Sequence, residues 1–262
     1  METATGIASL LCYLGIALWQ GHAFLKGNKV HSLVLIAVSF VAINLHAISV
    51  ALLIHPHEGI NLGFFQVSSL IFWVICLLLW ISNFRLPVGN LNIIIYPLSA
   101  LSIANSLAFT SEHNLTVTIE ISMHILVSLL AYSLLTVACI QAFALGVQDK
   151  MLRNKHFQGF MRVIPPLQTM EKLLFQILWA GMVLLTLSIV SGFLFFDNMA
   201  EQHLAHKMFF SCVAWLIYAI LLWGHHRHGW RGKKAIRWAT GGFIALMLAY
   251  FGSKFVLELL LS

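Results

Sequence analysis

Charged side chains are scarce in this chain. Only 9% of its 262 residues are Asp, Glu, Lys or Arg, while 60% are hydrophobic. A water-soluble globule needs more polar surface than this composition supplies, so a soluble domain is excluded. The composition predicts an all-α, polytopic integral membrane protein.

Cysteine is also rare, and each of the four cysteines stands alone inside an apolar stretch. There is no C-x-x-C pair for thiol exchange and no C-x-x-C-H motif for covalent haem attachment. Lone cysteines in such surroundings act as small hydrophobic residues. The sequence therefore gives no sign of disulfide chemistry.

Eight apolar stretches, each near or above the ~20 residues needed to cross the hydrocarbon core, predict eight transmembrane helices in one domain spanning residues 1–262. Between the fifth and sixth, residues 148–172 form the longest loop, for which we expect a short interfacial helix and then a turn at Pro165 and Pro166. The eight stretches are Thr5–Leu25, Val30–Ile54, Leu62–Ser82, Leu91–Phe109, Val117–Val147, Leu173–Phe196, Met208–Gly224 and Ala235–Leu260.

The basic residues predict the orientation of these helices. With both termini outside, thirteen of the fifteen Lys and Arg residues fall in the loops that then face the cytoplasm. The positive-inside rule therefore predicts an N-out, C-out arrangement. The net charge of +6 is explained by this topology and by attraction to the lipid bilayer, and it requires no nucleic-acid partner.

Histidine is the abundant residue that can carry chemistry, with thirteen copies. Most lie at predicted membrane interfaces, but His46 and His124 fall inside predicted spans, both about 10 to 12 Å below the outer surface. Ionisable groups in the membrane usually face the bundle interior, where they pair with each other or serve an ion, a proton or a cofactor. Their matching depth makes a shared ligand one interpretation of this pair.

Haem suits neutral imidazoles in an aromatic, apolar pocket, because its iron accepts axial histidines. Zinc is disfavoured, since a closed site requires three or four ligands and no Cys or carboxylate is predicted at that depth. A plain hydrogen bond between helices, for example from His124 to a serine, is the structural alternative. These alternatives stay open on the residues alone.

A second distinctive string, W-G-H-H-R-H-G-W-R-G-K-K, runs from Trp223 to Lys234. Tryptophans and basic residues are also common anchors at a membrane interface, so the string alone does not indicate a site. With M-H-I-L-V-S-L-L-A-Y-S-L-L at Met123–Leu135, L-A-Y-F-G at Leu248–Gly252 and H-A-I at His46, however, it resembles the cytochrome c assembly proteins of the CcsA and CcmF type. The resemblance is strongest to their small HemX-like and YpjD-type branch.

This resemblance implies a multi-pass protein of the bacterial inner membrane that binds haem b without a covalent bond. His124 matches the first periplasmic haem-ligating histidine of the family, and we expect His46 or His206 as its partner. His225 is a possible substitute for a deeper family histidine, whose place is taken here by Trp223. Haem, the bilayer and other cytochrome c assembly or membrane proteins are the implied partners.

The sequence departs from the family pattern at the tryptophan-rich outer loop, which reads F-F-D-N-M-A-E-Q-H-L-A-H-K-M before the seventh span, and at the C-terminus, where the second periplasmic histidine is missing. These departures favour haem handling over full haem lyase activity, so we do not expect an enzyme. Two other readings stay open. One is a transport or regulatory subunit for a metal ion that uses His46 and His124 without haem, and the other is an electron carrier with an inner pair of His22 and His225.

Overall fold

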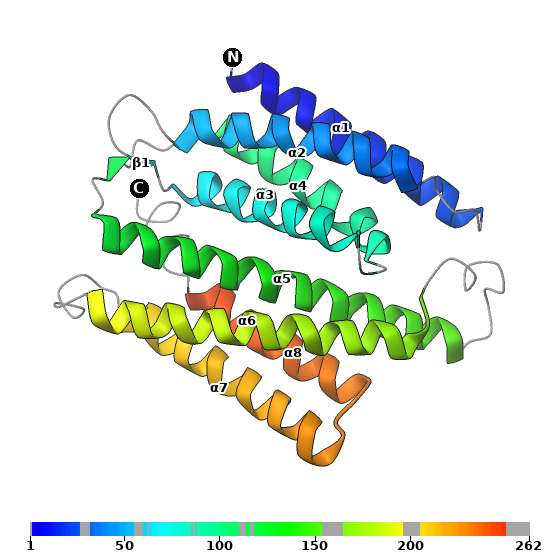
Figure 1. The fold of residues 1–262 in the computed structure, drawn as a ribbon, viewed down its shortest axis with the longest axis vertical. Helices are drawn as coiled ribbons and strands as arrows, with labels where there is room; N and C mark the ends of the chain where they lie inside the picture. Colours follow the sequence, from blue (N-terminus) through cyan, green and yellow to red (C-terminus); the bar gives the residue numbers. More distant parts are fainter. Residues whose placement is uncertain are drawn as a thin grey trace. The chain divides into compact units, whose positions relative to one another are not determined.

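The computed structural model describes residues 2–26, 32–54, 60–61, 63–84, 86, 88–109, 114–115, 118–153, 165–195 and 205–249. Nearly all of them are helical (Figure 1). The elements are α1 Glu2–Leu25, α2 Ser32–Ile54, β1 Ile60–Asn61, α3 Phe64–Ser82, the 3-10 turn η1 Gly89–Leu91, α4 Asn92–Ala108, β2 Asn114–Leu115, α5 Ile119–Arg153, α6 Leu167–Phe195, α7 Ala205–His228 and α8 Lys233–Met247.

Seven of the described helices, α1 to α7, are long and apolar enough to cross a membrane. The prediction of a helical, multi-pass protein is thus confirmed. The eighth predicted span is described as far as Ala249. Its helix α8 has 15 residues, about 22 Å, and the span beyond residue 249 lies outside the described residues. The count of eight and the N-out orientation stay predictions.

The described chain divides into two compact units. The N-terminal unit contains α1 to α4, and the C-terminal unit contains α5 to α8. In the N-terminal unit, α1 packs against α2 and α4, and α3 also packs against α2 and α4. The two-residue strands β1 and β2 pair antiparallel at one end of this unit, with Ile60 opposite Leu115.

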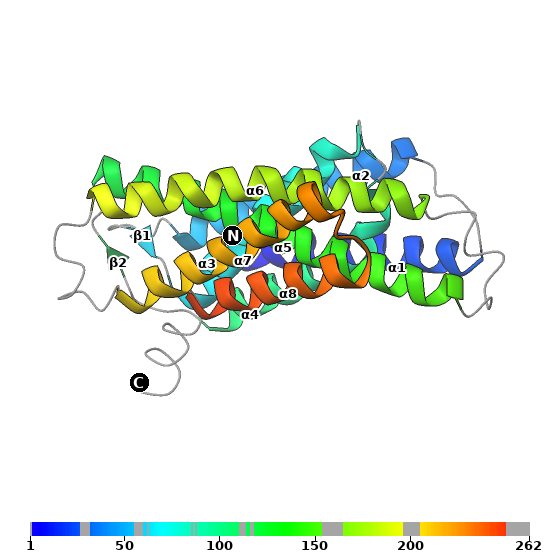
Figure 2. The same cartoon turned by 90° about the horizontal axis from the view of Figure 1, so that it is seen from below.

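The C-terminal unit repeats this pattern of neighbours, because α5 packs against α6 and α8, and α7 also packs against α6 and α8. Figure 2 shows the short turn that joins α7 to α8. The core of this unit is a continuous apolar cluster that includes Leu135, Leu174, Leu178 and Leu221. Most of the buried polar side chains lie in the N-terminal unit instead.

The prediction of a loop over residues 148–172 was wrong at both ends. Residues 148–153 continue α5, and α6 already begins at Leu167, directly after the two prolines. The backbone N–H of Thr169 donates to the carbonyl of Pro166, as expected where proline opens a helix. Hydropathy missed these turns because their polar residues extend the helices beyond the apolar stretch.

Candidate functional site

His124 lies in the second turn of α5 and faces α6. Its Nδ1 atom is 2.8 Å from the hydroxyl oxygen of Ser191, and its Nε2 atom has a longer contact of 3.4 Å with the hydroxyl of Ser128. The side chain is half-buried. The imidazole is therefore fixed at a helix–helix seam while part of it stays accessible from outside the bundle.

A short line of serines supports this histidine. Ser128, one turn further along α5, donates its hydroxyl proton to the carbonyl of His124 at 2.7 Å and lies 2.7 Å from the hydroxyl of Ser188 on α6. Ser191 and Ser188 are three residues apart, so both sit on the face of α6 that meets α5. The sequence analysis missed these serines, although their spacing after His124 and along α6 was a signal that could have revealed them.

Gly192 brings a third helix to the same place. A Cβ atom built on Gly192 would lie 3.3 Å from Cε1 of His124 and 4.0 Å from Cε of Met208. The imidazole on α5 and the thioether on α7 thus flank one glycine on α6. His206 precedes Met208 by two residues on α7, but its side chain lies outside the described residues.

His46 has very different surroundings in the N-terminal unit. Its side chain is 0% exposed. Its Nε2 shares a 3.0 Å hydrogen bond with the hydroxyl of Ser69 on α3, and its Nδ1 has a 3.4 Å contact with the hydroxyl of Tyr13 on α1. Both ring nitrogens are therefore engaged, and protein encloses the ring.

The polar surroundings of His46 extend through the same unit. The ring of Tyr13 also contacts the ring of Tyr96 on α4, with 5.0 Å between centroids, and the Tyr96 hydroxyl donates to Ser39 on α2 at 2.9 Å. The two tyrosines and their partners connect α1, α2, α3 and α4. This network explains how an imidazole is accommodated inside an apolar bundle, because each hydrogen bond between helices offsets part of its desolvation.

His225, at the other end of the C-terminal unit, is held by backbone and ring contacts. Its Nδ1–H donates to the carbonyl of Trp230 at 2.9 Å, and its ring stacks on Phe175 of α6 with 3.5 Å between centroids. This assignment fixes the tautomer and directs Nε2 away from the carbonyl. His225 is half-buried, whereas its neighbour His226 is exposed.

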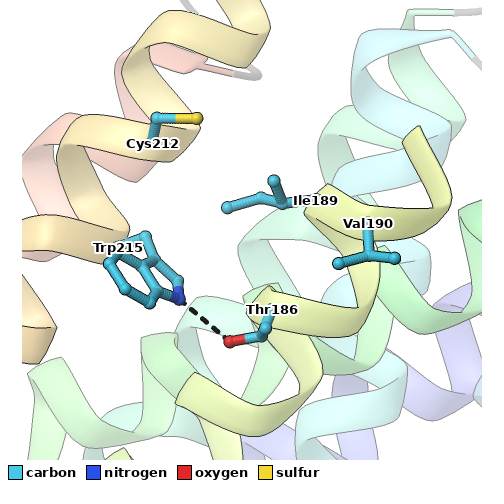
Figure 3. Close-up of a pocket in the computed structure, with 5 residues that line it drawn as sticks. All are labelled: Thr186, Ile189, Val190, Cys212 and Trp215. Carbon is cyan, nitrogen blue, oxygen red and sulfur yellow. Dashed lines mark hydrogen bonds between the residues drawn. The ribbon is translucent and has the colours of Figure 1, made fainter. Parts of the chain in front are cut away.

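An apolar hollow of about 270 Å³ lies between α6 and α7. Figure 3 shows Thr186, Ile189 and Val190 on one side, Cys212 and Trp215 on the other, and the Trp215 indole N–H donating to the Thr186 hydroxyl at 2.9 Å. Its volume is below the ~300 to 1,000 Å³ of typical ligand pockets, and no histidine lines it. It is not the place for a macrocyclic ligand that is held by imidazole.

The three histidines described above differ in how well they are placed to act as ligands of haem iron. A metal-binding histidine usually has one ring nitrogen fixed by a neighbouring group, which orients the other nitrogen toward the metal. Ser191 holds Nδ1 of His124 in this way, and the carbonyl of Trp230 does the same for His225. His46 has a similar pair of contacts, one short and one of 3.4 Å, but its ring is fully buried, whereas that of His124 is half-buried.

Comparison with known proteins places this geometry in context. A family model described as "Cytochrome C assembly protein" matches residues 27–261. The inner membrane protein YpjD of Escherichia coli K12 is 34% identical over 224 residues, which cover 84% of this chain and 85% of that protein. The cytochrome c biogenesis protein CcsA of Guillardia theta is 24% identical over 151 residues, which cover 51% and 50%. No solved structure matches.

Proposed function

Because the chain belongs to the cytochrome c assembly protein family, we propose that it is a haem-handling protein of the bacterial inner membrane, in which His124 is an axial ligand of a non-covalently bound haem b. The family match includes both units, which supports a single functional domain over residues 1–262. Several helices of membrane-spanning length support the same location.

The observation that carries the proposal is the hydrogen bond between His124 Nδ1 and Ser191. This bond holds Nδ1 and so orients the imidazole, while Nε2 is the nitrogen that would bind iron. The ring is half-buried near the beginning of α5, so part of it stays accessible to a ligand. Haem bound there would supply a one-electron redox centre.

The second ligand is the finer part of the proposal. The sequence nominates His46 or His206, and the described contacts add Met208, because its thioether lies against the same glycine as His124. Histidine and methionine are both axial ligands of haem iron, and methionine raises the reduction potential. His225 is the candidate for a separate ligand at the opposite end of α7.

Handling of haem, rather than its attachment to a polypeptide, is the activity we favour. Attachment requires thiol chemistry on an apocytochrome and a surface where that protein docks. The tryptophan-rich outer segment associated with presentation of haem is replaced here by a sequence without tryptophan at residues 195–208. We therefore propose that the protein receives, holds or passes on haem, together with other membrane proteins of cytochrome c assembly.

The test is an absorption spectrum of the full chain, purified in detergent from cells that make ample haem, first oxidised and then reduced. We expect a Soret band with sharp reduced α and β bands, as for low-spin haem. His124→Ala should remove most of the bound haem, while the matched variant His226→Ala, which removes an exposed histidine of α7, should retain it.

Variants at His46, His206 and Met208 then identify the second ligand by the shift each causes in the α band. A protein that remains colourless after titration with haem would contradict the proposal and favour the metal-ion alternative. Unchanged haem content in His124→Ala would contradict only the assignment of His124 as a ligand, and not the proposal that the protein binds haem.

A further inference from the structure

The turn between α7 and α8 has a fixed conformation. Gly229 and Gly232 adopt φ values of 61° and 54°, a region that residues with a side chain rarely occupy. The backbone N–H of Gly229 donates to the carbonyl of His225 at 3.1 Å, and that of Trp230 donates to the carbonyl of Gly224 at 3.2 Å. Trp230 and Arg231 thus lie between the two glycines in a closed turn.

Aromatic packing fixes the side chains of this turn as well. The indole of Trp230 lies on Gly224, where a Cβ would meet it at 2.5 Å, and it also contacts the ring of Trp238. Lys234 places its ammonium nitrogen 3.6 Å from the centre of the Trp230 ring. A lysine held this way has already lost part of its rotational freedom, which lowers the cost of binding an anion.

Positive charge collects here, and one carboxylate, that of Glu171, reaches the turn. Residues 227–237 include five basic residues and no acid. Within the described part of the chain, the only ion pair recorded joins Arg153 to Asp149 on α5, far from this turn in sequence. The acid that reaches the turn, Glu171 of α6, accepts the backbone N–H of Gly232 at 3.2 Å. The basic side chains, all exposed, are Arg227, Arg231, Lys233, Lys234 and Arg237.

The turn also lies at the predicted boundary of the membrane. The apolar span of α7 finishes at His228, immediately before the turn, and Trp223, Trp230 and Trp238 mark the interfacial level at which lipid headgroups lie. The anion most abundant at this depth is the phosphate of the surrounding lipid. We propose that the α7–α8 turn is a binding site for the phosphate group of an anionic phospholipid, with Arg231 and Lys234 as its principal contacts.

A fixed site differs from the general attraction of basic loops to anionic membranes. General attraction depends on the number of charges and hardly on their position. A built site depends on Lys234, which packs over Trp230, and on Arg231, which lies in the backbone turn between the two glycines. The α5 end offers a matched comparison, since Lys150 and Arg153 are equally exposed basic residues on the same predicted face of the membrane.

The experiment measures lipid binding to the full chain by native mass spectrometry, in neutral detergent micelles that contain phosphatidylglycerol or phosphatidylcholine. We expect the wild type to retain phosphatidylglycerol in preference. A basic side chain near an anionic surface contributes about fivefold in affinity, so Arg231→Gln/Lys234→Gln should weaken this binding about thirtyfold. Lys150→Gln/Arg153→Gln, which removes the same charge from the end of α5, should leave it within about twofold of wild type, because neither side chain belongs to the turn.

Thermal unfolding in phosphatidylcholine alone establishes that each variant is folded. Arg231→Lys/Lys234→Arg keeps both charges and should therefore retain binding of phosphatidylglycerol. Equal affinity of the wild type for the two lipids would overturn the proposal. So would an equal loss in the two Gln double variants, because it would indicate diffuse attraction. Full displacement of the lipid by inorganic phosphate would assign the turn to a soluble anion instead.

Discussion

Ser191 fixes the orientation of the imidazole at His124, since its hydroxyl is 2.8 Å from Nδ1. On the proposed function, Ser191→Ala should weaken haem binding about 10- to 100-fold, the usual effect of losing a group that positions a metal ligand. Titration of the purified variant with haem measures this change. Ser122→Ala, whose hydroxyl only donates to its own helix at the carbonyl of Thr118, is the control. Equal affinities in the two variants would mean that Ser191 has no positioning role.

At the scale of residues, the sequence predicted which histidines lie within the membrane helices, but not their contacts or their burial. It identified His46 and His124 as histidines within the membrane, and both lie within helices that could cross it. It could not show that Tyr13 and Ser69 enclose His46 while His124 stays half-buried. Such differences depend on which faces of separate helices meet, and each helix here is apolar nearly all round.

At the scale of elements, the packing of α7 on α8 depends on one glycine of a neighbouring pair. A Cβ on Gly242 would lie 2.7 Å from Cζ of the buried Tyr218 ring, whereas a Cβ on Gly241 would meet nothing within 4 Å. We expect Gly242→Ala to lower the free energy of unfolding by about 1 to 3 kcal/mol through overpacking. Gly241→Ala should be neutral or stabilise by up to about 1 kcal/mol, because alanine favours helix. Unfolding in mixed micelles measures both, and a Gly242→Ala protein as stable as wild type would contradict the packing.

Hydropathy located the seven described membrane helices but missed the C-terminal end of α5, the start of α6 and both ends of α7. The extension at the start of α6 has a structural reason within the C-terminal unit. Gln141 donates to the carbonyl of Met170 at 2.9 Å, and Glu171 accepts from Gly232 of the α7–α8 turn. The extra turns of α6 therefore make contacts that stabilise the polar end of this unit. A helix that continues for such tertiary reasons leaves no periodic apolar signal in the sequence.

At the scale of the whole molecule, the predicted orientation can be tested directly. Two single cysteines are introduced into a chain whose native cysteines are replaced by alanine. Thr118→Cys, just before α5, should react with a membrane-impermeant maleimide in intact spheroplasts. His228→Cys, at the end of α7, should react only after the membrane is permeabilised. The reverse pattern would place the termini inside and invert the interpretation of every loop.

The charge pattern allowed this orientation to be predicted, and the family could be predicted from the motifs around His124 and Trp223, which the match over residues 27–261 confirms. The division into two compact units could not be predicted. No linker or change in composition separates the units, because both are built from similar apolar helices. Contacts distinguish them, and a single sequence does not show contacts.

The length of α5 couples His124 to the thickness of the bilayer. At 35 residues this helix is about 52 Å long, more than the ~40 to 45 Å of a bilayer with its headgroups. Hydrophobic mismatch of the long helix is relieved by tilting, and the tilt increases as the membrane becomes thinner. Greater tilt brings His124 nearer to the headgroups. Membrane thickness is therefore a physical variable that sets how deep this imidazole lies.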